Sequence, residues 1–145
     1  MRRAPAGLAR VRAALAGLAH AATALAGVAL LVISPAALAC ELPGGTAQAL
    51  KSSTYTVLYR TAPLKVGEHF AVDFVVCPGP ESVRVDAWMP EHRHGMNYLP
   101  DVRAQGGGRY RAEGLMLHMA GRWELVFEVR SAGRTERLAQ SLRLE

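Results

Sequence analysis

The chain has 145 residues, enough for one domain of ordinary size. Lys and Arg number 17 against 12 Asp and Glu, a formal charge of +5, but four of the arginines fall within the first 12 residues. The rest of the chain is almost neutral and lacks the basic stripe that nucleic-acid binding requires, so we expect no nucleic-acid partner.

Residues 1–39 have the features of a secretory signal peptide. Arginines precede the apolar run AATALAGVALLVI, and a small-residue ending, Ala37-Leu38-Ala39, follows it. We expect cleavage after Ala39, which leaves residues 40–145 as a mature domain in the periplasm or outside the cell. The alternative is an uncleaved membrane anchor, because the apolar stretch approaches the ~20 residues that span a bilayer. Pro35 would break such a helix just before the cleavage motif, which favours cleavage.

The sequence contains two cysteines, Cys40 at the expected mature start and Cys77 at the end of an apolar run. In an exported protein such a pair predicts a disulfide, which would stabilise the fold by about 4 kcal/mol in the chain-entropy model. The alternative is a lipoprotein, tethered to a membrane by a lipid on Cys40. Such signals usually carry leucine three residues before the cysteine, where this chain has Ala37, and the difference favours the disulfide.

Alternating apolar residues begin after residues 40–53, which we expect to be an irregular lead-in. The segments TYTVLYR, HFAVDFVVC and SVRVDAW each predict a strand with one buried face. The residues expected to point inward are Tyr55, Val57, Tyr59, Phe70, Val72, Phe74, Val76, Val83, Val85 and Ala87.

The second half of the chain continues the same pattern. Residues 100–108 predict a loop, since their three consecutive glycines allow a sharp reversal. GRYRAEG and LMLHM predict two short strands, Ala120-Gly121 a hairpin turn, and RWELVFEVR and RTERLAQSLRLE two more strands. The inward set of RWELVFEVR is expected to be Trp123, Leu125, Phe127 and Val129.

About seven short strands with no helix beyond the signal peptide predict an all-β fold. The fold class we expect is an immunoglobulin-like antiparallel β-sandwich over residues 40–145, with a closed barrel as the main alternative.

The stretch MPEHRHGMNYLP, residues 89–100, spaces His92, His94 and Met96 by two. In an extended chain residues two apart point to the same side, so these three side chains can converge. Imidazole suits copper, zinc and nickel, and the soft thioether of methionine adds selectivity for Cu(I). The stretch therefore predicts one half of a copper site.

The segment MLHM offers the second half, with Met116, His118 and Met119. If Leu115, Leu117 and Met119 fill the core, Met116 and His118 point outward, as a surface site requires. The alternative is a structural turn at Gly95 and Asn97, with the histidines bonded to backbone and the methionines acting as core filler. Both interpretations stay open from the residues alone.

The runs VDAWMPEHRHGMNYLP and GRYRAEGLMLHMAGRWELVFEV together resemble the YtkA-like domain family of small exported bacterial proteins. The resemblance covers about residues 54–130 and implies an immunoglobulin-like sandwich. Relatives known as FixH-like proteins are associated with copper supply to respiratory oxidases. The resemblance therefore implies copper as the ligand, and a copper-dependent oxidase or another periplasmic or membrane protein as the partner.

Together these features favour an exported, non-enzymatic protein that binds or transfers copper. The sequence shows no activated serine or cysteine nucleophile and no H-E-x-x-H motif, so we do not expect an enzyme. The alternative function is a protein-interaction module without a metal, in which Trp88 and Tyr98 contact the partner.

Overall fold

The computed structural model describes residues 40–145, which lie in one compact unit, and the expected signal peptide falls outside the described residues. Within residues 40–145 there is no helix long and apolar enough to cross a membrane. The described strands are β1 (Gln48–Lys51), β2 (Thr56–Thr61), β3 (His69–Cys77), β4 (Ser82–Met89), β5 (His94–Gly95), β6 (Asp101–Gly106), β7 (Arg109–Met116), β8 (Gly121–Ser131) and β9 (Arg134–Leu144).

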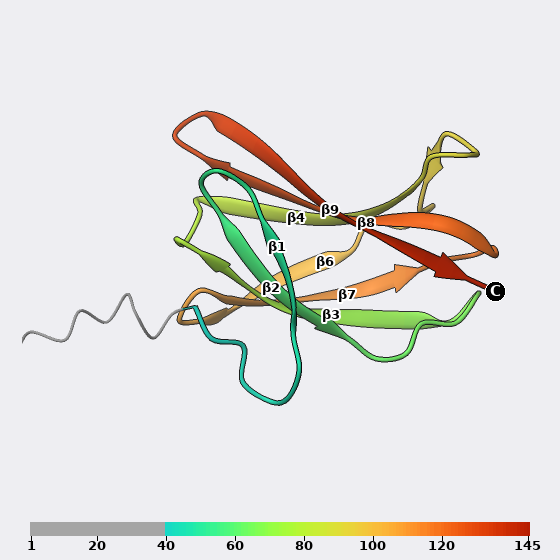
Figure 1. The fold of residues 1–145 in the computed structure, drawn as a ribbon, viewed down its shortest axis with the longest axis horizontal. Coiled ribbons are helices and arrows are strands. Elements are labelled where there is room, and N and C mark those ends of the chain that lie inside the picture. Colours follow the sequence, from blue (N-terminus) through green and yellow to red (C-terminus); the bar gives the residue numbers. More distant parts are fainter. Residues whose placement is uncertain (1–39) are drawn as a thin grey trace, which may run out of the picture. The chain divides into compact units, whose positions relative to one another are not determined.

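These strands form two sheets that face each other (Figure 1). One sheet has five strands in the order β1-β2-β3-β7-β6, and the other has four in the order β5-β4-β8-β9. Every neighbouring pair is antiparallel. The antiparallel β-sandwich predicted from the sequence is therefore confirmed, with nine strands over residues 40–145 in place of about seven.

Side chains from the inner faces of both sheets fill the space between them. Two aromatic residues of the five-stranded sheet, Tyr59 and Phe74, each lie with their ring centroid 5.3 Å from that of Phe127 on β8. Burying one such side chain stabilises the fold by roughly 1.5–3 kcal/mol. The inward set predicted for β8 is confirmed, since all four of its members are fully buried: Trp123, Leu125, Phe127 and Val129.

Two segments that we expected to be irregular are strands in the structure. The lead-in contains β1, which pairs with β2, and residues 100–108 contain β6, which pairs with β7. Both strands lie at the edges of the five-stranded sheet, and most of their residues are exposed. They therefore lack the apolar alternation from which strands are predicted.

The predicted hairpin between LMLHM and RWELVFEVR is wrong. β7 lies in the five-stranded sheet and β8 in the other, so residues 117–120 cross from one sheet to the other. β7 also replaces the two short strands that we expected there. Its residues Glu113 and Gly114 oppose Ala71 alone in the β3 ladder, and Gly114 has a φ of 82°, as in a bulge that favours glycine.

A disulfide joins Cys40 to Cys77, with the two Cα atoms 5.6 Å apart. It ties the first described residue to the last residue of β3. Arg60 of β2 holds the lead-in at a second place, because its guanidinium donates hydrogen bonds to the carbonyl oxygens of Pro43 and Gly44. The segment before β1 is thereby fixed although it has no regular structure.

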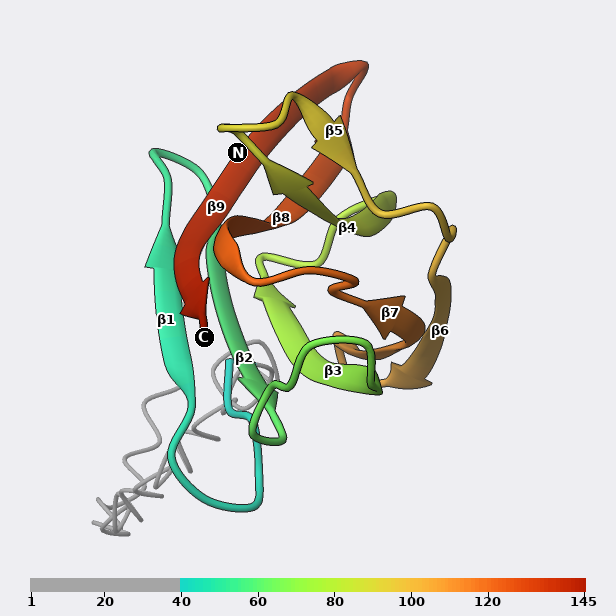
Figure 2. The same cartoon turned by 90° about the vertical axis from the view of Figure 1, so that its right-hand side faces the viewer.

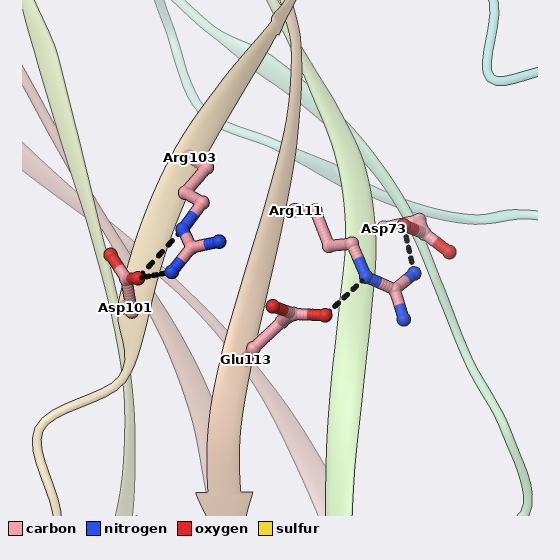
Figure 3. A network of polar contacts seen from close by, with 5 residues as sticks. All are labelled: Asp73, Asp101, Arg103, Arg111 and Glu113. Carbon is pink, nitrogen blue, oxygen red and sulfur yellow. Dashed lines mark hydrogen bonds and ion pairs between the residues drawn. The ribbon is translucent and has the colours of Figure 1, made fainter.

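Charged side chains alternate on the outer face of the five-stranded sheet (Figure 3). Arg111 of β7 donates to Asp73 of β3 at 2.7 Å and to Glu113 of its own strand at 2.9 Å. On β6, Arg103 and Asp101 form a similar pair at 2.6 Å. Arg103 and Arg111 are direct neighbours across the ladder, so these carboxylates offset their repulsion. Exposed pairs contribute at most about 1 kcal/mol each, and their main effect is to keep this face polar.

One end of the sandwich gathers the segments that carry the histidines (Figure 2). β4 ends there and turns into β5, and β7 ends there before the chain crosses to β8. A group of buried apolar residues fills this end of the core, namely Ala87, Met89, Leu117, Trp123 and Leu144. The loops at this end therefore pack against a buried apolar layer.

The disulfide gives the first prediction. Replacing both cysteines, Cys40→Ala with Cys77→Ala, removes a cross-link between residues 37 apart in sequence. We expect the free energy of unfolding to fall by about 4 kcal/mol, measured by urea denaturation at equilibrium. As a control, a reductant should lower the denaturation midpoint of the wild-type protein and leave that of the double variant unchanged. Equal stability of the wild-type protein without reductant and the double variant would contradict a structural role for the bridge.

Candidate functional site

The turn between β4 and β5 sets the positions of His92 and His94. Arg93 adopts a left-handed conformation with φ 57°, and the backbone N–H of His92 donates to the carbonyl oxygen of Met89 at 3.2 Å. This tight turn brings His94 directly opposite Met89 in the ladder. Residues that face each other across a ladder point to the same side, and Met89 is buried, so His94 faces the interior end of the sandwich.

Met96 continues the same face. Its backbone N–H donates to the carbonyl oxygen of Ala87 at 3.1 Å, which extends the pairing with β4 one step beyond Gly95. Met96 is half-buried and packs against both groups of buried core residues. The expectation that His94 and Met96 share a side therefore agrees with the pairing, despite the glycine between them.

The crossing from β7 to β8 brings His118 to the same end. Leu117 is fully buried, and its carbonyl oxygen accepts a hydrogen bond of 2.8 Å from the backbone N–H of Gly67. On the other side of His118, the carbonyl oxygen of Met119 accepts a bond of 3.0 Å from the indole nitrogen of Trp123. His118 is thus held between two anchored residues.

The rings of His94 and His118 stack with their centroids 5.2 Å apart. The Trp123 ring lies edge-on to both, at 5.8 Å from His94 and 5.3 Å from His118. The ring of His92 adds to the group from the exposed side, 5.8 Å from His94. Two segments that are more than twenty residues apart in sequence therefore place three imidazoles and one indole side by side.

The hydrogen bonds of these imidazoles indicate which nitrogens are free. Nδ1 of His94 lies 3.0 Å from the carbonyl oxygen of Gly95. Since a carbonyl can only accept, that nitrogen carries the proton, and Nε2 of a neutral His94 keeps its lone pair. Among the side chains that the structure describes, Nδ1 of His118 is a buried nitrogen with no hydrogen-bond partner. Buried nitrogens are normally partnered, so this atom fits a ligand role.

The six predicted metal ligands do not all come together. The ring of His94 contacts those of His92 and His118, and Met96 and Met119 are half-buried and pack against the apolar layer at this end. Met116 is separate: it lies opposite His69 on β3, on the face of the sheet turned away from the buried Leu115.

The outward orientation expected for His118 is corrected by the structure. The expectation depended on strand alternation through MLHM, but β7 ends at Met116 and His118 lies in the crossing loop. Trp123 was predicted only as a core residue, and its position beside the histidines was missed. The alternation in β8 was enough to predict that Trp123 points inward. Its contacts with His94 and His118 depend on the crossing of residues 117–120 between the sheets, which was not predicted.

The donor set of this site is mixed. Over residues 40–145 the structure has no group of three or more His, Cys, Asp or Glu side chains arranged to hold a metal ion. Met96 and Met119, which pack against the apolar layer at this end, could add thioether sulfur to the imidazole nitrogens of His94 and His118. Such a nitrogen and sulfur set favours a soft ion, Cu(I), over hard cations.

Comparison with known proteins identifies one family and one similar structure. The sequence model of the family described as YtkA-like matches residues 50–128. None of the curated proteins matches the chain. A crystal structure of a DUF4426 family protein from Pseudomonas aeruginosa PAO1 is similar with a TM-score of 0.48 and 10% identity, over 67% of this chain and 93% of that one.

The position of Trp123 gives the second prediction. In Trp123→Phe an aromatic ring remains, but the carbonyl oxygen of Met119 loses its indole donor and the core loses volume. We expect the free energy of unfolding to fall by about 1–3 kcal/mol and amide exchange in residues 117–120 to become faster. The matched control is Trp88→Phe, because Trp88 is 39% exposed on the outer face, and it should change stability by no more than about 0.5 kcal/mol. Equal effects of the two substitutions would contradict the anchoring role.

Proposed function

Because the chain belongs to the YtkA-like family, we propose that it is an exported, non-enzymatic protein that binds copper and transfers it to a partner. The copper is cargo, held as Cu(I) by His94 and His118 with Met96 and Met119 completing the site. His92 lies at the exposed edge, where an incoming or departing ion passes first. The receiving partner would be a copper-dependent oxidase or another periplasmic or membrane protein.

The observation that carries the proposal is the contact between His94 and His118. If residues 92–96 formed only a structural turn, the fold would not require a second histidine to stack on His94. Yet His118, from the connection between β7 and β8, does so. The buried Nδ1 of His118, which has no hydrogen-bond partner among the described residues, supports the same interpretation. A bound ion would satisfy that nitrogen.

The surroundings of the two histidines suit a carrier of copper. The indole of Trp123 and the apolar layer beneath limit water on the inner side, which protects a soft ion held by nitrogen and sulfur. His94 is only half-buried, so the ion stays accessible to a partner's ligands from the other side. Both cysteines of the chain are in the disulfide, so neither thiolate competes for the ion.

A second candidate function is favoured by the exposed apolar residues that follow the histidines. Leu99 is 86% exposed and Tyr98 45% exposed, in the connection from β5 to β6. Exposed side chains of this kind commonly contact a protein partner. In this alternative the chain is an interaction module, and residues 92–96 form a structural turn that presents Tyr98 and Leu99 to the partner.

Cu(I) titration distinguishes the two functions. Protein produced from the full 145-residue coding sequence is titrated with Cu(I) under reducing conditions against a chromogenic competing chelator. We expect the variant carrying His92→Ala, His94→Ala and His118→Ala to bind its tightest equivalent at least a hundredfold more weakly than wild type, since it lacks all the imidazole ligands of the site. Trp88→Phe serves as the control and should bind as wild type does.

Equal binding by the triple variant and wild type would contradict the copper site. The interaction module would then be the better account, and it makes its own prediction. Leu99→Ser should weaken binding to the natural partner while leaving the stability of the isolated protein unchanged, because Leu99 packs against little of the domain.

A further inference from the structure

One predicted ligand, Met116, has no place in the site formed by His94 and His118. It is the last residue of β7, and its direct partner across the ladder is His69, the first residue of β3. Because directly opposed residues extend to the same side of a sheet, the imidazole and the thioether are neighbours, with their Cβ atoms about 4.5–5.5 Å apart.

The pair lies on the outer face of the five-stranded sheet. Leu115, the residue before Met116, is fully buried between the sheets, so Met116 extends the opposite way. His69 is exposed and Met116 half-buried. The ring of Tyr98 lies edge-on to the imidazole of His69 with centroids 5.8 Å apart, which restricts the orientation of that imidazole.

We propose that His69 and Met116 form a second, exposed Cu(I) site at the same end of the sandwich. Cu(I) has a filled d shell and accepts two ligands in a nearly linear arrangement, for which one imidazole nitrogen and one thioether sulfur are a suitable pair. Two strand residues in direct register provide these donors without any change in the backbone. The inference deepens the proposed function, and it rests on that function for its choice of metal.

The surroundings of His69 give a metal donor room to approach. The imidazole lines a surface hollow of about 520 Å³ whose other walls include Lys65, Asp73 and Arg111. Asp73 and Arg111 are bonded to each other, and Lys65 is paired with Glu68, so these charges are largely matched. Arg60 also lines the hollow and is bonded to backbone carbonyl oxygens, so a singly charged ion on this route passes one cation that no carboxylate of the described residues offsets.

The two sites are connected through the chain itself. Only Leu117 separates Met116 from His118, and the two ligands extend to different sides of the crossing that begins there. The exposed pair of His69 and Met116 offers two donors. The inner site offers up to five, from the proposed ligands His92, His94, Met96, His118 and Met119. The exposed site should therefore bind more weakly and exchange faster, as a first contact for copper on its way to the inner site.

The number and the ligands of the bound ions test this inference. In the Cu(I) titration, the wild-type protein should bind two equivalents, the second more weakly than the first. Met116→Leu and His69→Gln should each weaken the second equivalent at least tenfold and leave the first unchanged. Both substitutions conserve side-chain volume approximately, and urea denaturation checks that each variant is folded.

A variant without the inner histidines separates this inference from the proposed function. With His92, His94 and His118 changed to alanine and one equivalent of Cu(I) added, X-ray absorption should show one nitrogen and one sulfur neighbour. Adding Met116→Leu should remove the sulfur signal. Unchanged titrations of Met116→Leu and His69→Gln would overturn the second site even if the inner site binds. Loss of copper in these two variants, with no effect of the inner histidines, would overturn the proposed inner site instead.

Discussion

The contact of β8 with the opposite sheet is the interaction on which the rest of this molecule depends. β8 pairs with β4 on one side and β9 on the other, and its inward side chains meet the aromatic residues of β2 and β3. Its first inward residue, Trp123, carries that packing to the end of the sandwich, where it contacts both stacked histidines. The geometry of the candidate site therefore follows from the core. A change that moves β8 would also move His94 and His118, the proposed ligands.

This dependence would matter for the affinity of the proposed copper site. Ligands held in place before binding lose less conformational entropy when the ion arrives. His118 lies between a buried leucine and a methionine whose carbonyl is bonded to the indole, and His94 is fixed by its ladder partner on β4. Met96 and Met119 are less constrained, because unbranched side chains keep several rotamers. The arrangement combines rigid imidazoles with adaptable thioethers, which would suit the proposed copper carrier, since it must both hold and release its ion.

The sequence was sufficient to predict the inner faces of the strands, because apolar alternation is a direct consequence of burial on one side. It was insufficient for β1 and β6, whose edge positions leave both faces largely solvated and so remove the alternation.

The residue types alone led us to expect His94 and His118 to lie close together, but not His118 to point inward. That position depends on where β7 ends and on the change of sheet that follows, and neither has a local signal. The pairing of Met116 with His69 depends on register, which single sequences specify poorly.

The disulfide lies at the opposite end of the sandwich from the histidines. β3 runs from His69 to Cys77, and nine residues of extended chain cover roughly 30 Å, so the bridge and the histidine cluster occupy opposite poles of the domain (Figure 1). The chain enters the domain at Cys40, at the pole of the bridge. A tether joined to the chain at Cys40 would therefore attach at the opposite end of the domain from the histidines. With the bridge and the histidines at opposite ends, the domain could be held at one end while the proposed copper transfer takes place at the other.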